Sequence, residues 1–498
     1  MNRDLRKQRL NGGNDLKQKN PTPQQLEKTA LKKQKEIKKW EREKARPKGH
    51  YYLIYLIFIV SLVYVADEIA SQIGTLMKTE IANDLMARFG EKSVGMLDII
   101  SFIAIPFQAL SVFYKPLSDR FGRKLFLVIN TFGMGLGMII IALTHGIALY
   151  IVGSVIIFFF VPHDMQVVYI MESAPSKHRA KIYSGVKCIA TIGIMLVPLF
   201  RRLFMTDASM WRMVYLAPAI VALAVSFVAL LFAKETDAFI ESRLSYLNMT
   251  DEELQRAKEE KSGKDAQGGF IKGLKFAWRH NQLRWSFIAT ALANFGAIIT
   301  LHYQVVMSYG FAGGIMDKTG ADLETALNEA SVGPVTAALF LFPVGSALAQ
   351  LFVGIFADSL GRKKSAVIMT GMTIVSFILL VAGSHYSWQP YVVGLFCGAA
   401  IGSYWGTTDI MGIINSESAP TRLRASILSA QFVPMGVGYA VAYLIGLPLI
   451  TLLGNSKVPV ITLCLAVPGM IAALIVMTLK VHDTKGVDLD RVTGTEWD

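Results

Sequence analysis

Long apolar stretches separated by short polar segments occupy most of the chain from residue 51 onward. Twelve of them approach or exceed the roughly 20 residues that an α-helix needs to cross the hydrocarbon core of a bilayer. Apolar residues run continuously within each stretch instead of alternating with polar ones, which excludes a closed β-barrel. The pattern therefore predicts an all-α membrane protein with twelve transmembrane helices, at about 51–77, 94–117, 124–144, 146–171, 180–200, 213–233, 285–311, 331–357, 364–384, 390–415, 425–450 and 458–480.

Two charged motifs each occur twice, about half a chain apart. The segment 119–124 returns in similar form at 358–363, and the segment 172–179 returns at 417–424. Each copy lies between apolar stretches at a matching place in the series. Such repetition indicates two homologous halves, and we expect two pseudo-symmetric six-helix bundles.

A polar segment with a Gly-rich break separates the two halves, so the chain divides into five parts. We expect a basic cytoplasmic tail at 1–50, an N-terminal six-helix bundle at 51–233, a cytoplasmic linker with short amphipathic helices at 234–284, a C-terminal six-helix bundle at 285–480 and a cytoplasmic tail at 481–498.

Composition agrees with a membrane protein. Hydrophobic residues make up 53% of the 498 residues and charged residues only 17%, with a mean hydropathy of +0.42. A soluble globular chain of this length is far less apolar. The three cysteines all lie in apolar stretches without metal-ligand spacing, so we expect neither a metal site nor another cofactor.

Basic residues predict the orientation. The first 50 residues hold 16 Lys and Arg against 6 Asp and Glu, and the loops on the same side as this tail hold 12 Lys and Arg against 8 on the other side. Positive charge stays cytoplasmic, which predicts a multi-pass protein of the plasma membrane with both termini inside. The net charge of +13 comes mainly from the tail, and no array of basic and aromatic residues suggests nucleic acid binding.

The repeated motifs suggest gating by ion pairs. Asp119 and Asp358 precede new helices, where the positive N-terminal dipole favours a carboxylate. The arginines that follow can form planar, bidentate bonds to the glutamates of the second motif. Such clusters would hold one conformation closed and would break in the other. The residues that we assign to gating are Asp119, Arg120, Arg123, Glu172, Arg179, Asp358, Arg362, Glu417 and Arg424.

The four motif copies resemble the major facilitator superfamily, and the resemblance covers nearly all of residues 51–480. The Glu-Ser-Ala-Pro blocks are most similar to the sugar-porter and organic-ion branches, which include symporters of metabolites and protons. The resemblance implies two bundles that rock against each other around a central site. It also implies that spans one, four, seven and ten line the pathway.

Ionisable groups deep in the membrane are costly and usually functional. Asp67 and Glu68 lie about 16 residues into the first span, which places them near or just beyond mid-membrane. The stretch around them is similar to the first span of proton-coupled sugar porters, where an aspartate takes up the proton. We therefore expect Asp67 and Glu68 to couple an ion to transport, unless they already belong to the wetter outer end of the span.

A second group of polar residues lies on the spans that would line the pathway. Asp164 and Asp409 stand eight residues before the two motif glutamates, at pseudo-symmetric positions, and Lys187 lies at a matching depth on the fifth span. Asp164 and Lys187 would form a buried pair, whereas Asp409 has no lysine at the matching position. The residues that we assign to solute binding are Gln108, Asp164, Gln166, Lys187, Asn294, His302, Tyr303, Gln304, Tyr404, Trp405 and Asp409.

The sequence therefore predicts a secondary active transporter that moves a small polar solute by alternating access, with protons as the coupling ion. A sugar, a polyol or an organic acid would fit. We expect a monomer in the lipid bilayer and no enzymatic activity, since neither a nucleophile–base set nor a nucleotide-binding loop is present. An exporter working as an antiporter, a facilitator and a non-transporting nutrient sensor remain alternatives.

Overall fold

The structure is a computed structural model. It describes residues 23–45, 52–104, 107, 110, 117–160, 169–170, 172–173, 179–250, 252–253, 270–313, 320–420 and 423–487. Six predicted site residues fall outside this description: Gln108, Asp164 and Gln166 entirely, and Asp119, Arg120 and Arg179 in their side chains.

The first half of the chain forms a helical bundle that follows the predicted apolar stretches. Gly133 and Gly137 face Phe160 and Ile157 of the neighbouring helix, so the backbones approach closely. A turn at residues 194–195 divides the fifth stretch into two helices. The helices are α3 (Tyr52–Leu76), α5 (Ser93–Ser101), α9 (Arg123–Ala142), α10 (Ile147–Phe160), α12 (Arg179–Gly193), α13 (Leu196–Phe204) and α14 (Trp211–Phe232).

The second half repeats this plan. Its seventh stretch is one long helix with a 3-10 turn, η6 (Asn294–Gly296), in its middle, and its eighth begins with a π-helical segment, η7 (Ser331–Val335), that contains Pro334. The other helices are α18 (Asn281–Ala293), α19 (Ala297–Phe311), α21 (Thr336–Ser359), α22 (Arg362–His385), α23 (Pro390–Glu417), α24 (Arg424–Ala430), α25 (Phe432–Leu453) and α26 (Val458–Lys480).

Helices α21 and α23 pack so closely that their contact leaves no room for a side chain at the glycines of α23. A Cβ atom added to Gly394 or Gly398 of α23 would lie 1.9 or 2.0 Å from a carbonyl oxygen of α21. Gly402, one turn further along, meets the same helix. This row of glycines joins two helices of the second bundle backbone to backbone.

The fold is all-α, with twelve transmembrane helices in two pseudo-symmetric six-helix bundles, as the sequence predicts. Eight helices of the described chain are long and apolar enough to cross a bilayer, and α10 is a shorter apolar helix. The predicted loop at 78–93 is instead mostly helical, because α4 (Lys78–Leu85) and η1 (Ala87–Lys92) continue the first span. Helix α20 (Gly320–Ala330) likewise occupies part of the predicted loop at 312–330.

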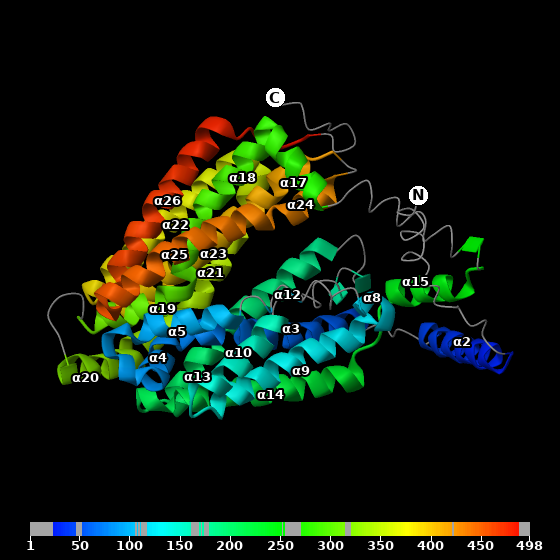
Figure 1. The fold of residues 1–498 in the computed structure, drawn as a ribbon, viewed down its shortest axis with the longest axis horizontal. Coiled ribbons are helices and arrows are strands. Elements are labelled where there is room, and N and C mark those ends of the chain that lie inside the picture. The colour runs from blue at the N-terminus through cyan, green and yellow to red at the C-terminus, as the bar shows by residue number, and fades with distance from the viewer. Residues whose placement is uncertain are drawn as a thin grey trace, which may run out of the picture.

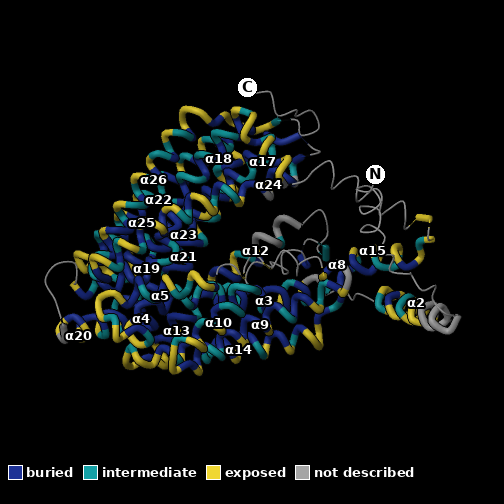
Figure 2. The backbone as a smooth tube through the Cα atoms, viewed as in Figure 1, coloured by how far each residue is buried: buried dark blue, intermediate teal, exposed yellow. Residues whose placement is uncertain are grey.

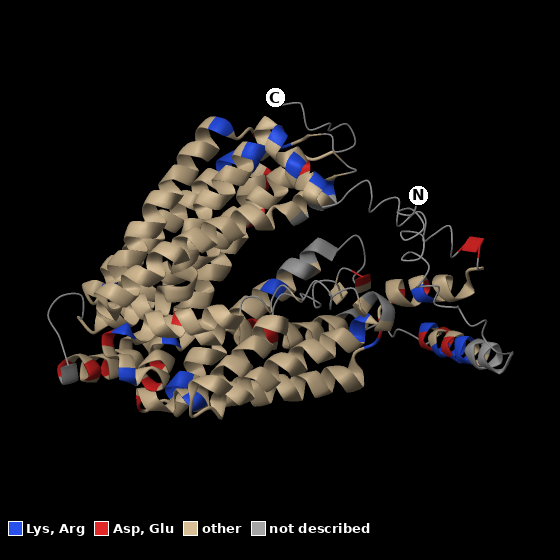
Figure 3. Cartoon of the chain, in the orientation of Figure 1, with Lys and Arg blue, Asp and Glu red and all other residues tan. Residues whose placement is uncertain are grey.

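Figure 1 shows the two bundles converging near α4 and α19 and diverging toward α8 (Ser118–Phe121) and α24. We call the first the closed end and the second the open end. Buried residues lie where helices face one another, while exposed residues cover the outside (Figure 2). Charged residues gather at the two ends and are sparse between them, as a bilayer requires (Figure 3).

Three further helices lie at the open end (Figure 1): α2 (Pro23–Lys44), α15 (Asp237–Asn248) and α17 (Phe270–Arg279). Helix α2 packs on α15, where the rings of Trp40 and Phe239 meet edge to face at 5.3 Å and Arg243 pairs with Glu36 at 2.8 Å. Both α15 and α17 fall within the predicted linker at 234–284.

Candidate functional site

The closed end is held by polar contacts between the bundles, which centre on Arg201 of α13. This arginine is fully buried, and one of its terminal nitrogens donates to Glu80 of α4 at 2.7 Å. The guanidinium also crosses to the second bundle, where it donates to the hydroxyl of Thr336 at 3.0 Å and to the backbone carbonyl of Ser331 at 2.9 Å. The buried Arg201–Glu80 ion pair of the first half is therefore hydrogen-bonded to the π-helical segment of the second half.

Gln304 of α19 extends this network. Its side-chain oxygen accepts hydrogen bonds from the backbone N–H and the hydroxyl of Thr79, at 2.9 and 2.8 Å, and its amide nitrogen donates to Glu80 at 3.1 Å. Asn455 makes a similar contact further along, because it accepts from the N–H of Val94 and donates to Ser93. We call these contacts between the halves, together with those of Arg201 and Lys78, the seam. The structure places Gln304 in the seam and not on an open solute cavity.

His302 also lies in the seam, two residues before Gln304. Its Nε2 is 2.8 Å from a carboxylate oxygen of Asp98 on α5, and Lys78 lies 2.5 Å from the other oxygen of that carboxylate. Lys78 also donates to the carbonyl of Leu301 at 2.9 Å. Three titratable side chains from both halves thus meet in one buried cluster.

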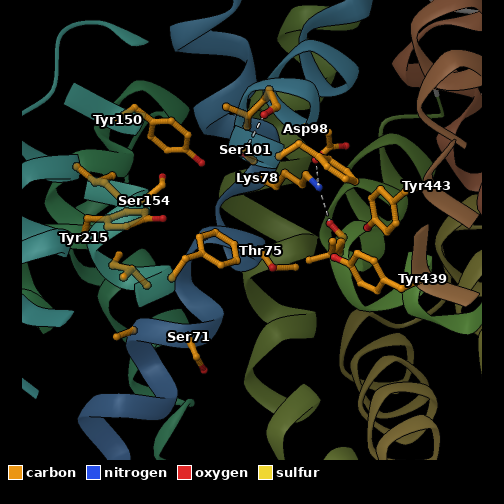
Figure 4. A pocket seen from close by; sticks show the side chains of 18 residues that line it. Ser71, Thr75, Lys78, Asp98, Ser101, Tyr150, Ser154, Tyr215, Tyr439 and Tyr443 are labelled. Atoms are coloured by element: carbon orange, nitrogen blue, oxygen red, sulfur yellow. Dashed lines mark hydrogen bonds and ion pairs between the residues drawn. The ribbon is translucent and has the colours of Figure 1, made fainter. Parts of the chain in front are cut away.

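A cavity of about 190 Å³ opens beside this cluster. Figure 4 shows Tyr150, Ser154 and Tyr215 on one side of it, with Tyr439 and Tyr443 on the other. Serines and threonines from α3 and α5 complete a lining rich in hydroxyl groups, which can both donate and accept hydrogen bonds. The polar lining residues are Ser71, Thr75, Lys78, Asp98, Ser101, Tyr150, Ser154, Tyr215, Tyr439 and Tyr443.

A larger cavity of about 610 Å³ lies between the bundles, nearer the open end. Lys187 of α12 and Asp409 of α23 both line it, together with Gln350 and Asp358 of α21. The sequence left Asp409 without a basic partner and paired Lys187 with Asp164 in its own bundle. In the structure Lys187 and Asp409 line the same cavity from opposite halves. Comparing matching positions of the two repeats does not reveal this proximity, because the two residues do not occupy matching positions.

The other predicted solute-binding residues of the described chain lie on the second bundle. Tyr404 donates from its hydroxyl to the side-chain oxygen of Asn294 at 2.7 Å, and Trp405 packs edge-on against Tyr404 with its own side chain exposed. Tyr303 is fully buried and stacks on Phe342. Asn294 and Tyr404 therefore form a tight pair, while Tyr303 packs inside the second bundle.

Asp67 lies on α3 with only 6% of its side-chain surface exposed. One of its carboxylate oxygens accepts a hydrogen bond from the hydroxyl of Thr131 at 2.9 Å. Glu68 is half-buried on the next position of the helix. An ionisable side chain buried within a membrane span is costly and usually functional, which makes Asp67 a candidate site residue.

Two matching charge clusters stand at the open end. In the first bundle, Arg123 donates through Nε to Glu172 at 3.0 Å, and Thr236 donates to the same carboxylate at 2.7 Å. Glu235 accepts from the backbone N–H of Arg123 at 3.0 Å and from that of Lys124 at 3.1 Å, which caps α9. Burial raises the pKa of Glu235 above its ordinary value, against the effect of these backbone bonds.

The second bundle repeats the main contacts of this cluster, with Asp483 in the place of Glu235. Arg362 donates through Nε to Glu417 at 3.2 Å, Thr484 donates to Glu417 at 2.5 Å, and Asp483 accepts from the backbone N–H of Arg362 at 3.0 Å. Arg362 also pairs with Asp358 at 2.9 Å. Each described ion pair here joins residues of one half, so the clusters do not bridge the open end.

Some of these residues escaped the sequence analysis. Glu235-Thr236 and Asp483-Thr484 form a third repeated motif, each directly after the last span of its half, and a search for repeats of two residues would have found it. Asp98 lies inside a predicted span and could have been singled out by that position alone. Glu80 and Arg201 fell in segments that were read as loops, so the pattern gave no reason to pair them.

Comparison with known proteins agrees with this architecture. A family model described as "Major Facilitator Superfamily" matches residues 51–317, and one described as "Sugar (and other) transporter" matches residues 309–484. The xylose transporter XylE from E. coli, in an inward open conformation, superposes with a TM-score of 0.60 at 17% identity, covering 89% of this chain and 99% of that one.

Curated relatives match over shorter stretches. The glucose transporter GlcP of Staphylococcus epidermidis is 23% identical over 65% of this chain and 72% of its own length. The human facilitated glucose transporter member 4 of solute carrier family 2 is 26% identical over 28% of this chain, and the match covers only 26% of that protein. Because the first family model matches more than half of the residues, the chain belongs to the major facilitator superfamily of membrane transporters.

Proposed function

We propose that the protein moves a sugar or a similar small polar solute across the plasma membrane by alternating access, with protons as the coupling ion. The observation that carries this proposal is the asymmetry between its two ends. A buried polar seam joins the bundles at one end, while a cavity lined by Lys187 and Asp409 lies between them toward the other. Such a molecule is suited to open at each end in turn.

The substrate class rests on the chemistry of the cavities and on the relatives. Hydroxyl groups of a sugar donate and accept at once, which suits the serines, threonines and tyrosines of the smaller cavity and the Lys187–Asp409 pair of the larger. The printed names of the relatives are those of glucose and xylose transporters. We further propose a monomer with both termini in the cytoplasm, so that the open end faces inward.

We assign proton coupling to Asp67, with Glu68 as the second candidate. Asp67 is buried in the first span and can load a proton on one side and release it on the other as its access to water changes. The charge clusters around Glu172 and Glu417 would act as gates by bridging the bundles when the open end closes. In the structure described here they are confined to their own halves.

Proteoliposomes test the proposal. The wild-type protein should accumulate a labelled sugar when the pH outside is lower than inside. Asp67→Asn should abolish this accumulation and retain counterflow of preloaded sugar, since exchange requires no net movement of protons. Glu68→Gln shows whether the neighbouring carboxyl contributes, and Glu329→Gln, at an exposed position on α20, is the matched control. Accumulation by Asp67→Asn at the wild-type level would move the coupling site elsewhere.

A panel of solutes decides the substrate class in the same vesicles. Counterflow of hexoses, pentoses and polyols supports the proposal. Counterflow of organic acids alone would assign Lys187 to a substrate carboxylate and would replace sugar as the solute.

A further inference from the structure

The cluster of Lys78, Asp98 and His302 is a buried group of titratable side chains to which both halves contribute. Only 6, 5 and 0% of their respective surfaces is exposed. Lys78 and Asp98 belong to the first half and His302 to the second. The cluster therefore exists only while the closed end stays closed.

The distances around His302 indicate where the protons of the Asp98–His302 pair lie. Its Nδ1 lies 3.0 Å from the carbonyl oxygen of Ile298. A carbonyl oxygen only accepts hydrogen bonds, so Nδ1 carries a hydrogen. Its Nε2 lies 2.8 Å from the carboxylate oxygen of Asp98. Two lone pairs do not approach to that distance, so a second proton must lie between Nε2 and the carboxylate.

Lys78 does not supply that proton. Its amino group lies 2.5 Å from the other oxygen of Asp98 and 2.9 Å from the carbonyl of Leu301, but 3.5 Å from Nε2 of His302. Of the two contacts that Nε2 of His302 makes, the one with Asp98 at 2.8 Å is shorter than the one with Lys78. Whether its proton sits on the imidazole or on the carboxyl group, the pair holds one proton more than a neutral histidine beside an ionised aspartate.

Among the described residues, the charged group in contact with the Asp98–His302 pair is Lys78, and the other titratable groups that line this place are tyrosines. Tyr443 of α25 stacks on His302 at 6.1 Å, and Figure 4 shows Tyr439 and Tyr443 on the same side of the cavity as Asp98, with Tyr150 on the other side. Glu80 and Arg201, the other buried acid and base of the seam, pair with each other. The proton on the Asp98–His302 pair is thus the feature that changes when the halves separate.

We propose that Asp98 and His302 form a proton-binding site that exists only in the closed seam, so that closing this end takes up one proton and opening it releases one. Once the halves part, water surrounds both groups. An exposed aspartate then stays ionised above about pH 4, and an exposed histidine is mostly neutral above about pH 6.5. Near neutral pH, neither group of the open state therefore holds the extra proton.

The sign of the linkage follows. Because the closed state binds more protons than the open state, acid favours closure and alkali favours opening. For one proton, the ratio of closed to open molecules changes by up to about tenfold per pH unit above pH 6.5. This inference rests on the alternating opening in the proposed function, but on neither the identity of the solute nor the role of Asp67.

Distances across the closed end test the site. In a background without Cys188, Cys397 and Cys464, spin labels are placed at Arg88 and Glu324, which are exposed at this end on opposite halves. Pulsed electron paramagnetic resonance then gives the closed fraction in lipid nanodiscs from pH 5.5 to 8.5. The wild-type closed fraction should fall as pH rises, with the slope given above.

Two variants remove the titration while keeping a hydrogen-bonding group at the site. His302→Gln and Asp98→Asn should each flatten the pH dependence. Thr336→Val is the matched control, since it weakens the seam at Arg201 without removing a titratable group. It should lower the closed fraction at every pH and keep the wild-type slope.

Each contrary outcome has its own meaning. Opening with no pH dependence in the wild type overturns the proton site and leaves alternating access intact. A wild-type slope in both His302→Gln and Asp98→Asn assigns the proton to another group. A single distance at every pH, for all variants, contradicts the opening itself and with it the proposed function.

Discussion

A few buried side chains make the hydrogen bonds of the seam, and Arg201 makes several of them. It donates to groups of both halves from a position that water does not reach. A buried charge of this kind adds little stability over an apolar packing, but removing one partner leaves the other charge uncompensated. Glu80 depends on Arg201 in this way.

Arg201→Ala should therefore open the closed end. The unpaired Glu80 destabilises the closed state by about 3–5 kcal/mol, the usual cost of breaking a buried pair. The same spin-label distances should shift to the open population. Arg202→Ala changes the neighbouring, exposed arginine and should leave the distances unchanged. A closed wild-type distance in Arg201→Ala would show that the seam does not depend on this pair.

The open-end clusters require glycine at one position each. Gly122 and Gly361 have φ values of +117° and +97°, and a Cβ atom there would meet the carboxylate of Glu235 or Asp483 at 2.3 or 2.1 Å. Gly122→Ala and Gly361→Ala should each lower stability by about 1–3 kcal/mol through backbone strain, and displace the capping carboxylate as well. Thermal unfolding in detergent measures the loss. A Cβ atom at Gly371 of α22 would meet open space, so Gly371→Ala should leave the melting temperature unchanged. Equal melting temperatures for all three variants would contradict the requirement.

The matched motifs indicated that these arginines and glutamates could pair, and they are in contact in the structure, while their role as gates stays a prediction. The seam was not predictable in the same way. His302 and Gln304 were expected on a solute cavity because they are polar residues in a pathway-lining span. Their partners lie on α4 and α5, more than 200 residues earlier in the chain. Contacts between halves leave no periodicity within either half, so only the folded arrangement reveals them.

At the scale of elements, helix packing explains where the second bundle is rigid. Helices α21 and α23 touch through the glycine row at Gly394, Gly398 and Gly402, whereas α12 faces α21 across a cavity. Close packing without side chains leaves no room to slide. We therefore expect α21 and α23 to move together as one body.

Gly398→Ala tests this rigidity. The added methyl group would lie 2.0 Å from the carbonyl oxygen of Phe342, so α21 and α23 must separate at a cost of about 1–3 kcal/mol or more. We expect a lower melting temperature and reduced transport together. Gly436→Ala on α25 faces open space and should match the wild type. An unchanged melting temperature for Gly398→Ala would mean that the two helices are not locked together.

At the scale of the whole molecule, apolar length predicted the two bundles, and the motif repeat predicted their symmetry. Segment ends were less accurate, because α4 buries its polar residues in the seam and so resembles a loop in composition. The basic tail and loops also predict the orientation, and this prediction is open to direct measurement.

Labelling of single cysteines in sealed cells measures the topology. Arg88→Cys at the closed end and Ser242→Cys on α15 at the open end are both exposed. Positive charge near the second position predicts that it is cytoplasmic. A membrane-impermeant thiol reagent should therefore label Arg88→Cys in intact cells, and Ser242→Cys only after permeabilisation. Labelling of both without permeabilisation would refute the orientation.

The polar character of the seam also affects how easily the two halves separate. An apolar interface is stabilised by about 25 cal/mol for each Å² that it hides from water, and all of this is lost on separation. A hydrogen bond contributes only about 0.5–1.5 kcal/mol, because water replaces the lost partner. Bonds such as those of Thr79 with Gln304 and of Asn455 with Ser93 are exchangeable in this sense. We therefore expect these polar contacts to favour the closed state less than an apolar interface of the same area would.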